Sequence, residues 1–299
     1  MIKIITLCIA IGLSISGYAF ELTNKVVTVV IPFTPGGGVD QTFRHLQKYA
    51  QEKNIQLVAL YKPGAEGLIA MHELAGMPAD GYHISLATVG VLAYHNIKQP
   101  TEEINVITGI RESVGAFVTH PNSQIENIVD LENAIKNKSN IKFGYGAPTQ
   151  KLMIEQLIEC VTQKSRVLMV PYKGSGQVLN DLLGGHIDVA QMPLSVIKPQ
   201  LDSGKLKLLA VTKQKVNEFP NIPVINHRYA KWKDFDGFVI VTPAKINADA
   251  LIFWETFLKN YVGNLQVQKE FNNEFTTALP FGAEHIAEII KLTTAKFSR

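Results

Sequence analysis

Short apolar runs alternate with helix-like segments along most of this chain, and a turn follows each run. Val26 to Phe33 is a β-branched run without polar–apolar alternation, typical of a strand buried on both faces. Apolar residues then recur at helical spacing from Val39 to Ala50. Further strand-like segments follow in the same order: 56–61, "HISLAT", "GAFVTH", "IKFGY", "VLMVPY", "HIDVAQMP" and "KLKLLAVT". This alternation predicts an α/β protein with mostly parallel sheets flanked by helices.

Length and charge limit the kind of protein and the kind of partner. The chain has 299 residues, of which 46% are hydrophobic, so it can form two domains. Its formal net charge is only +3, and no block of lysines and arginines occurs. We therefore expect neither nucleic acid nor an anionic membrane surface as a partner.

The first residues are typical of an export signal. Lys3 precedes an apolar run from Ile4 to Ile15, and small residues stand at Gly17 and Ala19. This pattern predicts a signal peptide over residues 1–19, cleaved before Phe20, and hence a periplasmic protein. A membrane anchor is the alternative, but a span needs about 20 apolar residues.

Four loops between a strand and a helix are rich in glycine or small residues: "TPGGGVD", "GYGAPTQK", "YKGSGQV" and "ATVG". In open parallel sheets, ligands bind at the carboxyl ends of the strands, where such loops lie. The amino terminus of a helix carries unpaired N–H groups and about half a positive charge, so it favours an anion. Glycine also serves tight turns for steric reasons alone, but several such loops together favour a carboxylate site.

Motifs for catalysis or cofactor binding are absent from the sequence. "GGGVD" is neither a dinucleotide-binding fingerprint nor a Walker A loop. The chain lacks G-x-S-x-G, H-E-x-x-H and C-x-x-C, and its eight histidines are scattered. We therefore expect a protein that is not an enzyme, with no cofactor, no metal and no catalytic residues.

Several stretches together resemble the substrate-binding proteins of tripartite tricarboxylate transporters, the TctC-like or Bug family. They are "IPFTPGGGVDQTFRHL", "KPGAEGLIAMHELAGMPADGYHISLAT", "VPYKGSGQVLNDLLGGHIDVAQMPLSVIKPQLDSGKLKLLAVT" and "FPNIPVI". The resemblance implies a two-lobed periplasmic-binding-protein-like fold of type II with two hinge strands, near Phe117–Thr119 and Ala210–Thr212. Lobe 1 would then comprise residues 20–118 and 213–299, and lobe 2 residues 119–212.

The resemblance also implies which residues bind the ligand. They are Phe33, Gly36, Gly37, Gly38, Asp40, Thr88, Tyr145, Ala147, Thr149, Gln150, Tyr172, Lys173, Gly174 and Asp188. Among the glycines, Gly36 is the one we expect to serve the turn, and Asp40 and Asp188 can equally be structural. Two departures from the family pattern stand out. "GAPTQK" replaces a loop that usually contains two more glycines and a serine, and Glu66 replaces a usual glycine, outside the expected cleft.

The function implied by the resemblance is capture of a small carboxylate in the periplasm. A monomeric binding protein would deliver this carboxylate to the membrane permease subunits of a tripartite transporter. Two alternatives stay open: a binding protein that reports its ligand to a sensor kinase, and an exported enzyme on the same fold.

The export prediction has a direct test. We expect the mature protein to begin at Phe20, or within two residues of it, because the small residues at Gly17 and Ala19 fit a signal-peptide cleavage site. Amino-terminal sequencing of the protein from a periplasmic extract checks this. Periplasmic protein that still carries Met1 would contradict it.

Overall fold

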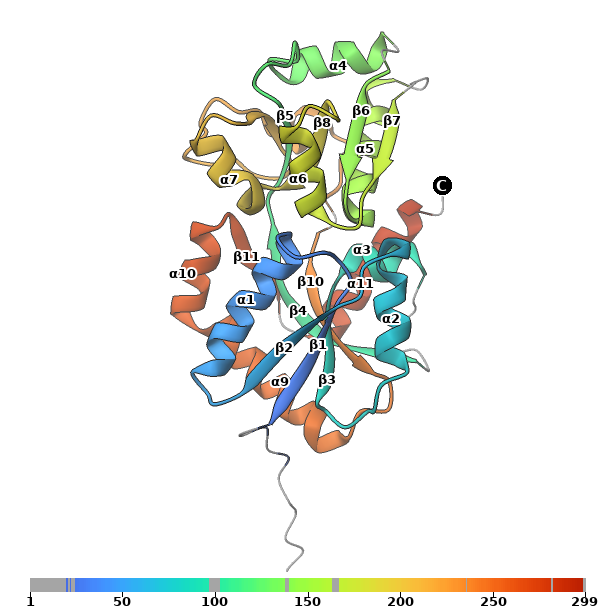
Figure 1. Ribbon diagram of the computed structural model, residues 1–299, viewed down its shortest axis with the longest axis vertical. Coiled ribbons are helices and arrows are strands. Elements are labelled where there is room, and N and C mark those ends of the chain that lie inside the picture. Colours follow the sequence, from blue (N-terminus) through green and yellow to red (C-terminus); the bar gives the residue numbers. More distant parts are fainter. Residues whose placement is uncertain are drawn as a thin grey trace, which may run out of the picture.

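Two β-sheets with their own helices form the molecule, one above the other in Figure 1. The computed structural model describes residues 20, 22, 25–96, 103–137, 140–162, 167–234, 236–280 and 282–297, so the expected signal peptide lies outside it. The strands of the six-stranded sheet, which we assign to lobe 1, are β1 (Val26–Ile31), β2 (Gln56–Tyr61), β3 (His83–Thr88), β4 (Ile104–Ser113), β10 (Phe238–Pro243) and β11 (Thr276–Ala278). The strands of the five-stranded sheet, in lobe 2, are β5 (Gly115–Thr119), β6 (Lys142–Tyr145), β7 (Leu168–Pro171), β8 (Val189–Pro193) and β9 (Lys207–Val211).

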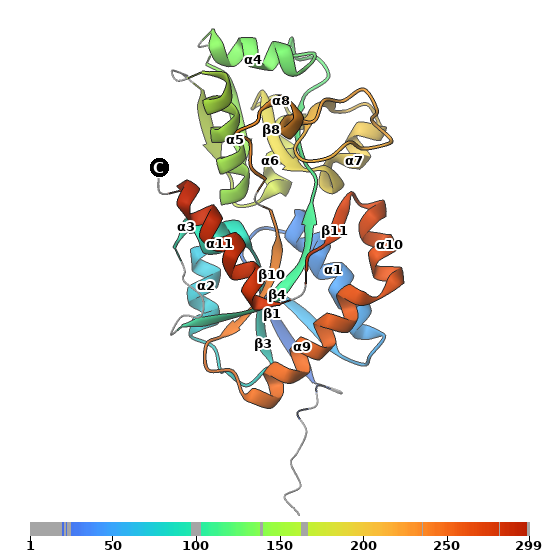
Figure 2. The same ribbon diagram turned by 180° about the vertical axis from the view of Figure 1, so that it is seen from behind.

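Helices cover both faces of each sheet (Figures 1 and 2). Those of lobe 1 are α1 (Gly38–Gln51), η1 (Ala65–Gly67), α2 (Leu68–Ala75), α3 (Val89–Tyr94), α9 (Ala248–Gly263), α10 (Leu265–Asn273) and α11 (Ala283–Phe297). Those of lobe 2 are α4 (Ile128–Lys136), α5 (Pro148–Val161), α6 (Ser175–Leu183), α7 (Leu194–Asp202) and α8 (Ile225–Arg228). Within the described residues, no helix has the length and apolar character needed to cross a membrane.

The fold class predicted from the sequence is confirmed, and both sheets are mixed rather than parallel throughout. In lobe 1, β1 pairs in parallel with β2 and β3, whereas β10 runs antiparallel to β3 and β4. In lobe 2, β6 pairs in parallel with β7 and β8, whereas β5 runs antiparallel to β8 and β9. In these antiparallel pairs, β5 and β10 are the strands that enter a sheet from the other lobe; β11 forms a further antiparallel pair with β4 at the edge of the lobe 1 sheet.

Each face of the lobe 2 sheet has its own core. Alternate residues of β5 separate onto the two faces, as the two-residue period of a strand requires. Ala116 and Val118 pack with the apolar residues of α6 and α7. Phe117 packs on the opposite face with α4, α5 and α8 and with Trp232. Residues up to Trp232 therefore belong to lobe 2.

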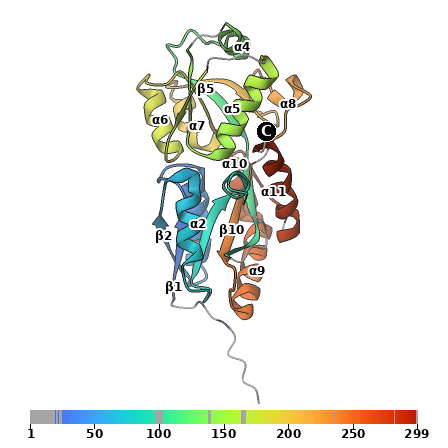
Figure 3. The ribbon, with the colours of Figure 1, turned by 90° about the vertical axis from the view of Figure 1, so that its right-hand side faces the viewer.

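The chain passes between the lobes at two places that lie side by side (Figure 3). At the first crossing, only Val114 separates β4 from β5, and its N–H donates to Phe275 while its carbonyl accepts from Leu194. The second crossing leads from Trp232 to β10, and the carboxylate of Asp236 accepts the N–H of Ser113 at 3.2 Å.

These crossings differ from the hinges that we expected from the family resemblance. Phe117 and Ala210, named there as hinge residues, pair with each other inside the lobe 2 sheet. The predicted segments are neighbours, as hinge strands should be, but β5 and β9 both continue as buried strands. Residues 115–118 and 213–232 therefore lie with lobe 2 and not with lobe 1.

Buried carboxylates gather where the chain crosses. Asp234 has both carboxylate oxygens buried, and burial raises its pKa to about 6 despite the nearby Lys213. That lysine already pairs with Glu112 at 2.9 Å. Because the folded protein holds the Asp234 proton more tightly than the unfolded chain, whose aspartates titrate near pH 4, stability should fall as the pH rises from about 4 to 6.

We therefore expect Asp234→Asn to raise the free energy of unfolding by about 1–2 kcal/mol at pH 7.5, and by much less near pH 4. Denaturant unfolding at the two pH values measures this. Glu255→Gln, at an exposed position of α9, controls for the loss of a carboxylate. An equal effect of Asp234→Asn at both pH values would contradict the assignment.

Candidate functional site

A small cavity lies between the two lobes, next to the crossings. Its volume is about 40 Å³. Both lobes contribute to its wall, which consists of Phe33, Thr34, Gly37, Gly38, Val39, Asp40, Thr88, Gly115, Gly146, Ala147, Thr149, Gln150, Met153, Ser175, Gln191, Pro193, Asp236 and Phe238. We call this space the interlobe cavity.

Four helices of nine residues or more begin at the interlobe cavity. Gly37 and Ala147 precede the first residues of α1 and α5, Pro193 precedes α7, and Ser175 is the first residue of α6. The first N–H groups of a helix have no partner within it, and together they carry a partial positive charge. Helix starts from both lobes therefore present N–H donors to one space.

Among the residues that the structure describes, no cationic side chain lines the interlobe cavity, and the ionisable ones in its wall are Asp40 and Asp236. Asp40 is occupied elsewhere: its Oδ2 accepts from the N–H of Gly36 at 2.9 Å and pairs with Arg44, and its Oδ1 accepts from the hydroxyl of Tyr61. Among the described residues, no group of three or more His, Cys, Asp or Glu side chains lies close enough to hold a metal ion.

The glycines between β1 and α1 have different roles. Gly36 has a φ of +87°, a left-handed conformation that favours glycine, and thus serves the turn as expected. Gly37 has a φ of −94°, which other residues adopt readily. A Cβ on Gly37 would lie 3.5 Å from the Cβ of Ser175 in the other lobe, and one on Gly38 would lie 3.0 Å from Phe238. Gly38 therefore serves a close approach at the cavity, whereas a methyl group on Gly37 would make only an ordinary van der Waals contact with Ser175.

Main-chain contacts hold the same loops together across the lobes. The N–H of Thr34 donates to the carbonyl of Lys173 at 3.0 Å. A Cβ on Gly174 would lie 2.4 Å from the hydroxyl of Thr34, so only glycine permits this approach. Farther along α1, the hydroxyl of Ser195 donates to Gln41 at 2.9 Å.

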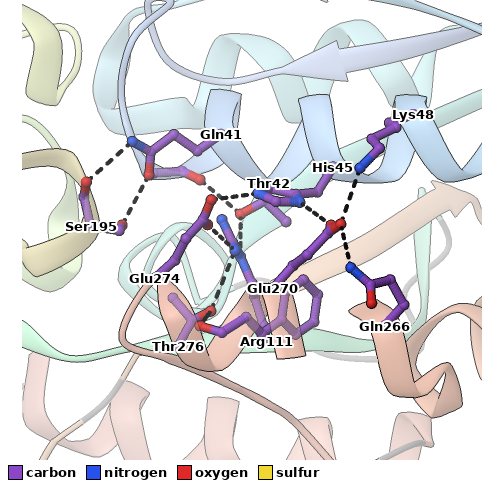
Figure 4. Close-up of polar contacts among 12 residues, drawn as sticks. Gln41, Thr42, His45, Lys48, Arg111, Ser195, Gln266, Glu270, Glu274 and Thr276 are labelled. Atoms are coloured by element: carbon purple, nitrogen blue, oxygen red, sulfur yellow. Dashed lines mark hydrogen bonds and ion pairs between the residues drawn. The ribbon is translucent and has the colours of Figure 1, made fainter. Parts of the chain in front are cut away.

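A buried arginine anchors the first turn of α1 (Figure 4). The Nε of Arg111 donates to Thr42, whose hydroxyl in turn donates to the carbonyl of Gly38. On the other side, Arg111 pairs with Glu274 at 2.8 Å. Burial raises the pKa of Glu274, but the hydrogen bonds from His45 and Arg111 outweigh it and lower the pKa below its usual value. Arg111 therefore holds the start of α1 in place through Thr42. Its guanidinium lies 5.8 Å from the centre of the Phe238 ring.

The start of α5 turns one of its own side chains back onto the cavity wall. The Oε1 of Gln150 accepts from the N–H of Gly146 at 2.6 Å, and its Nε2 donates to the hydroxyl of Ser175 at 2.7 Å. Other buried wall atoms have no hydrogen-bond partner among the described residues, namely the hydroxyls of Thr34 and Thr149 and the Oε1 of Gln191.

Part of the sequence-predicted site gathers at the interlobe cavity. The residues that line it are Phe33, Gly37, Gly38, Asp40, Thr88, Ala147, Thr149 and Gln150. Gly36 and Gly174 stand beside the wall without lining it. Asp188 lies elsewhere: its Oδ2 accepts the N–H of Lys142 at the far end of β6, so its role is structural.

A second, more open pocket adjoins the first through Phe33, Gly146 and Ala147. The predicted site residues Tyr145, Tyr172 and Lys173 line this pocket instead. Glu66 lines this second pocket together with residues of lobe 2, and it does not line the interlobe cavity. Its backbone is left-handed, with a φ of +52°, a conformation that favours glycine.

Sequence reasoning missed several cavity residues. Gly146 and Ser175 belong to the glycine-rich loops already singled out, one position from residues that were named. Gln191 and Pro193 lie at the carboxyl end of β8, a place where the rule for open sheets expects ligands. Asp236 and Phe238 belong to the second crossing, and no sequence motif predicts that they line the cavity.

Comparison with known protein families gives one match that spans most of the chain. Residues 42–290 match the family described as "Tripartite tricarboxylate transporter family receptor". The protein BugT of Bordetella pertussis is 27% identical over 233 residues, which are 73% of this chain and 71% of that protein. The "UPF0065 protein in gbd 5'region" of Cupriavidus necator is 28% identical over 218 residues, 69% of this chain and 65% of that protein.

Solved structures agree in fold at low sequence identity. "R. palustris Rpa4515 with adipate" superposes with a TM-score of 0.84 at 21% identity, covering 93% of this chain and 96% of that one. "MatC (Rpa3494) from Rhodopseudomonas palustris with bound malate" gives 0.80 at 14% identity, covering 91% and 97%. The periplasmic binding protein BugD gives 0.81 at 22% identity, covering 91% and 95%.

The contacts of Asp40 predict a structural role that can be measured. Asp40→Ala removes the acceptor of the Gly36 N–H and of the Tyr61 hydroxyl, so we expect the free energy of unfolding to fall by about 1–3 kcal/mol. Tyr61→Phe, which removes one of these partners, should cost less. Denaturant unfolding without any ligand checks both variants. Unchanged stability of Asp40→Ala would mean that the glycine loop does not depend on this carboxylate.

Proposed function

The chain belongs to the tripartite tricarboxylate transporter receptor family, and we propose that it is a periplasmic solute-binding protein that captures a small carboxylate in the interlobe cavity. In this role it binds its ligand without transforming it. It then delivers the ligand, as a monomer, to the membrane permease subunits of a tripartite transporter.

One observation carries the proposal: the starts of α1, α5, α6 and α7 meet at a cavity whose described wall residues include no lysine, arginine or histidine. Their N–H groups suit the oxygens of a carboxylate. The hydroxyls of Thr34 and Thr149, buried and without a partner among the described residues, can add donors. Because both lobes supply these groups, binding favours the closed arrangement of the lobes.

The names of the relatives point to the same ligand class. Adipate and malate, named in the titles of two structures of the same fold, are both carboxylates. The interlobe cavity is small, which favours a short ligand over a long one.

A panel of carboxylates tests the proposed function. We expect at least one short carboxylate to raise the melting temperature by several degrees, since a ligand at 100 times its Kd adds about 2.7 kcal/mol of stability. The corresponding amide, such as succinamide for succinate, serves as the uncharged control and should have no effect. Mass spectrometry of molecules retained through purification gives an independent reading. Conversion of the ligand to a product would favour the exported enzyme instead.

The delivery step needs a test in cells. Deletion of the gene should abolish uptake of the radiolabelled carboxylate that the purified protein binds, and the intact gene should restore it. Normal uptake in the deletion strain, together with binding by the purified protein, would favour the sensory alternative.

The glycine loop supplies a matched pair of variants. Gly38→Ala places a methyl group 3.0 Å from Phe238 and 3.2 Å from Pro193 of lobe 2. If one charge-assisted hydrogen bond to the carboxylate is lost, affinity should fall by about 1.5–3 kcal/mol, roughly 10- to 150-fold. Gly36→Ala meets no atom within 4 Å but must adopt a φ of +87°. It should cost about 1–2 kcal/mol of stability and leave affinity unchanged. Titration calorimetry and melting separate these outcomes, and full affinity of Gly38→Ala would exclude the loop as the carboxylate site.

A further inference from the structure

The interlobe cavity contains acceptors as well as donors, and they lie together beside the crossings. Asp236 stands at the second crossing, where its Oδ2 accepts from Ser113 and its Oδ1 from Gly237 at 2.9 Å. Gln191 reaches the same place from β8, since a Cβ on Gly115 would lie 2.5 Å from its side-chain nitrogen. Both residues line the cavity together with Gly115. We call this part of the wall the acceptor end.

Gln191 leaves an acceptor without a donor. Its side chain is 2% exposed, and its Oε1 has no hydrogen-bond partner among the described residues. A buried amide oxygen left without a partner costs free energy, so such atoms normally find one. A ligand with a hydrogen-bond donor at this position supplies it.

The Asp236 carboxylate carries a charge that no neighbour cancels directly. The described residues form no ion pair with it, and its only hydrogen bonds are to backbone N–H groups. Lys213 lowers the pKa of Asp236 but already pairs with Glu112, whose own negative charge acts in the opposite direction. Burial disfavours the ionised carboxylate and raises the pKa of Asp236. A cation placed beside Asp236 would offset this cost and stabilise the ionised form.

A ligand with only negative charges fits this wall poorly. Asp40 and Asp236 already lie in the wall. Arg44 pairs with Asp40 and partly offsets its negative charge, but it does not pair with Asp236. A dicarboxylate brings two more negative charges into a buried space, where repulsion is weakly screened. A zwitterion brings one anionic group for the helix starts and one cationic group for the acceptor end.

We propose that the ligand is a zwitterionic amino acid, with its carboxylate at the helix starts and its ammonium group at Asp236 and Gln191. This inference rests on the proposed function and narrows its ligand class. Asp236 and Gln191 then determine specificity: they discriminate an amino acid from the same acid without the amino group. An ammonium has three donors, which suit two carboxylate oxygens and one amide oxygen.

Matched pairs of ligands test the inference. Each pair differs only by the amino group: L-alanine and propionate, L-aspartate and succinate, L-glutamate and glutarate, L-leucine and 4-methylpentanoate. Titration calorimetry at pH 7.5 with the full-length mature protein gives the Kd of every member. We expect at least one amino acid to bind tenfold or more tightly than its partner acid.

Two variants assign the effect to the acceptor end. Asp236→Asn and Gln191→Leu should each weaken binding of the preferred amino acid by tenfold or more, and weaken its partner acid far less. Asp249→Asn, at an exposed position in the first turn of α9, is the control and should change neither Kd. Gln191→Leu keeps the test decisive if Asp236→Asn fails to fold.

Three other outcomes would contradict the amino-acid inference, and one of them would also contradict the proposed function. If an acid without the amino group binds as tightly as its amino acid, the inference fails and the proposed function stands. If both variants weaken the two members of a pair alike, Asp236 and Gln191 are merely structural and the inference fails. If no member of any pair binds, the proposed function fails and the inference with it.

Discussion

The path of the chain between the two sheets constrains everything else in this molecule. β4 passes into β5 through the single residue Val114, and the return to β10 is tied alongside by the hydrogen bond from Ser113 to Asp236. Because the two crossings lie side by side, the loops that follow β1, β6, β7 and β8 reach the same space. The helices that follow these strands must then begin there. A site built from helix starts is thus a consequence of topology, and it needs only glycines where the loops come close.

Such a site binds through main-chain groups, and this determines what its side chains have left to do. N–H groups at helix starts accept any carboxylate of suitable size. Arg111, which could have supplied a positive charge, is instead held by Glu274 and Thr42 behind the wall. Discrimination between ligands therefore falls to the few polar side chains of the wall, chiefly Gln150, Gln191 and Asp236.

Sequence reasoning succeeded where a local pattern has a local cause. The strand–loop–helix order predicted the fold class, and the position of Gly36 in the run of three glycines predicted a turn, which its φ of +87° confirms. It failed where long-range pairing decides. The segment "GAFVTH" predicted a strand, but nothing local in it reveals that Phe117 lies in the sheet of lobe 2, because its partner Ala210 comes some ninety residues later. Asp236 stayed hidden for the same reason, since its place in the wall depends on the crossing and not on its neighbours in sequence.

Gln150 gives the binding site a built-in competitor. Its amide oxygen already occupies the N–H of Gly146, and its amide nitrogen already occupies Ser175, at the start of α5 and α6. An incoming molecule must either leave these two groups to the glutamine or displace a side chain that is tethered at very high local concentration. In the first case, the space that Gln150 leaves free limits the length of the ligand. In the second case, displacing the Gln150 side chain lowers the net affinity for the ligand. The ligand then dissociates more easily when the protein meets its transport partner.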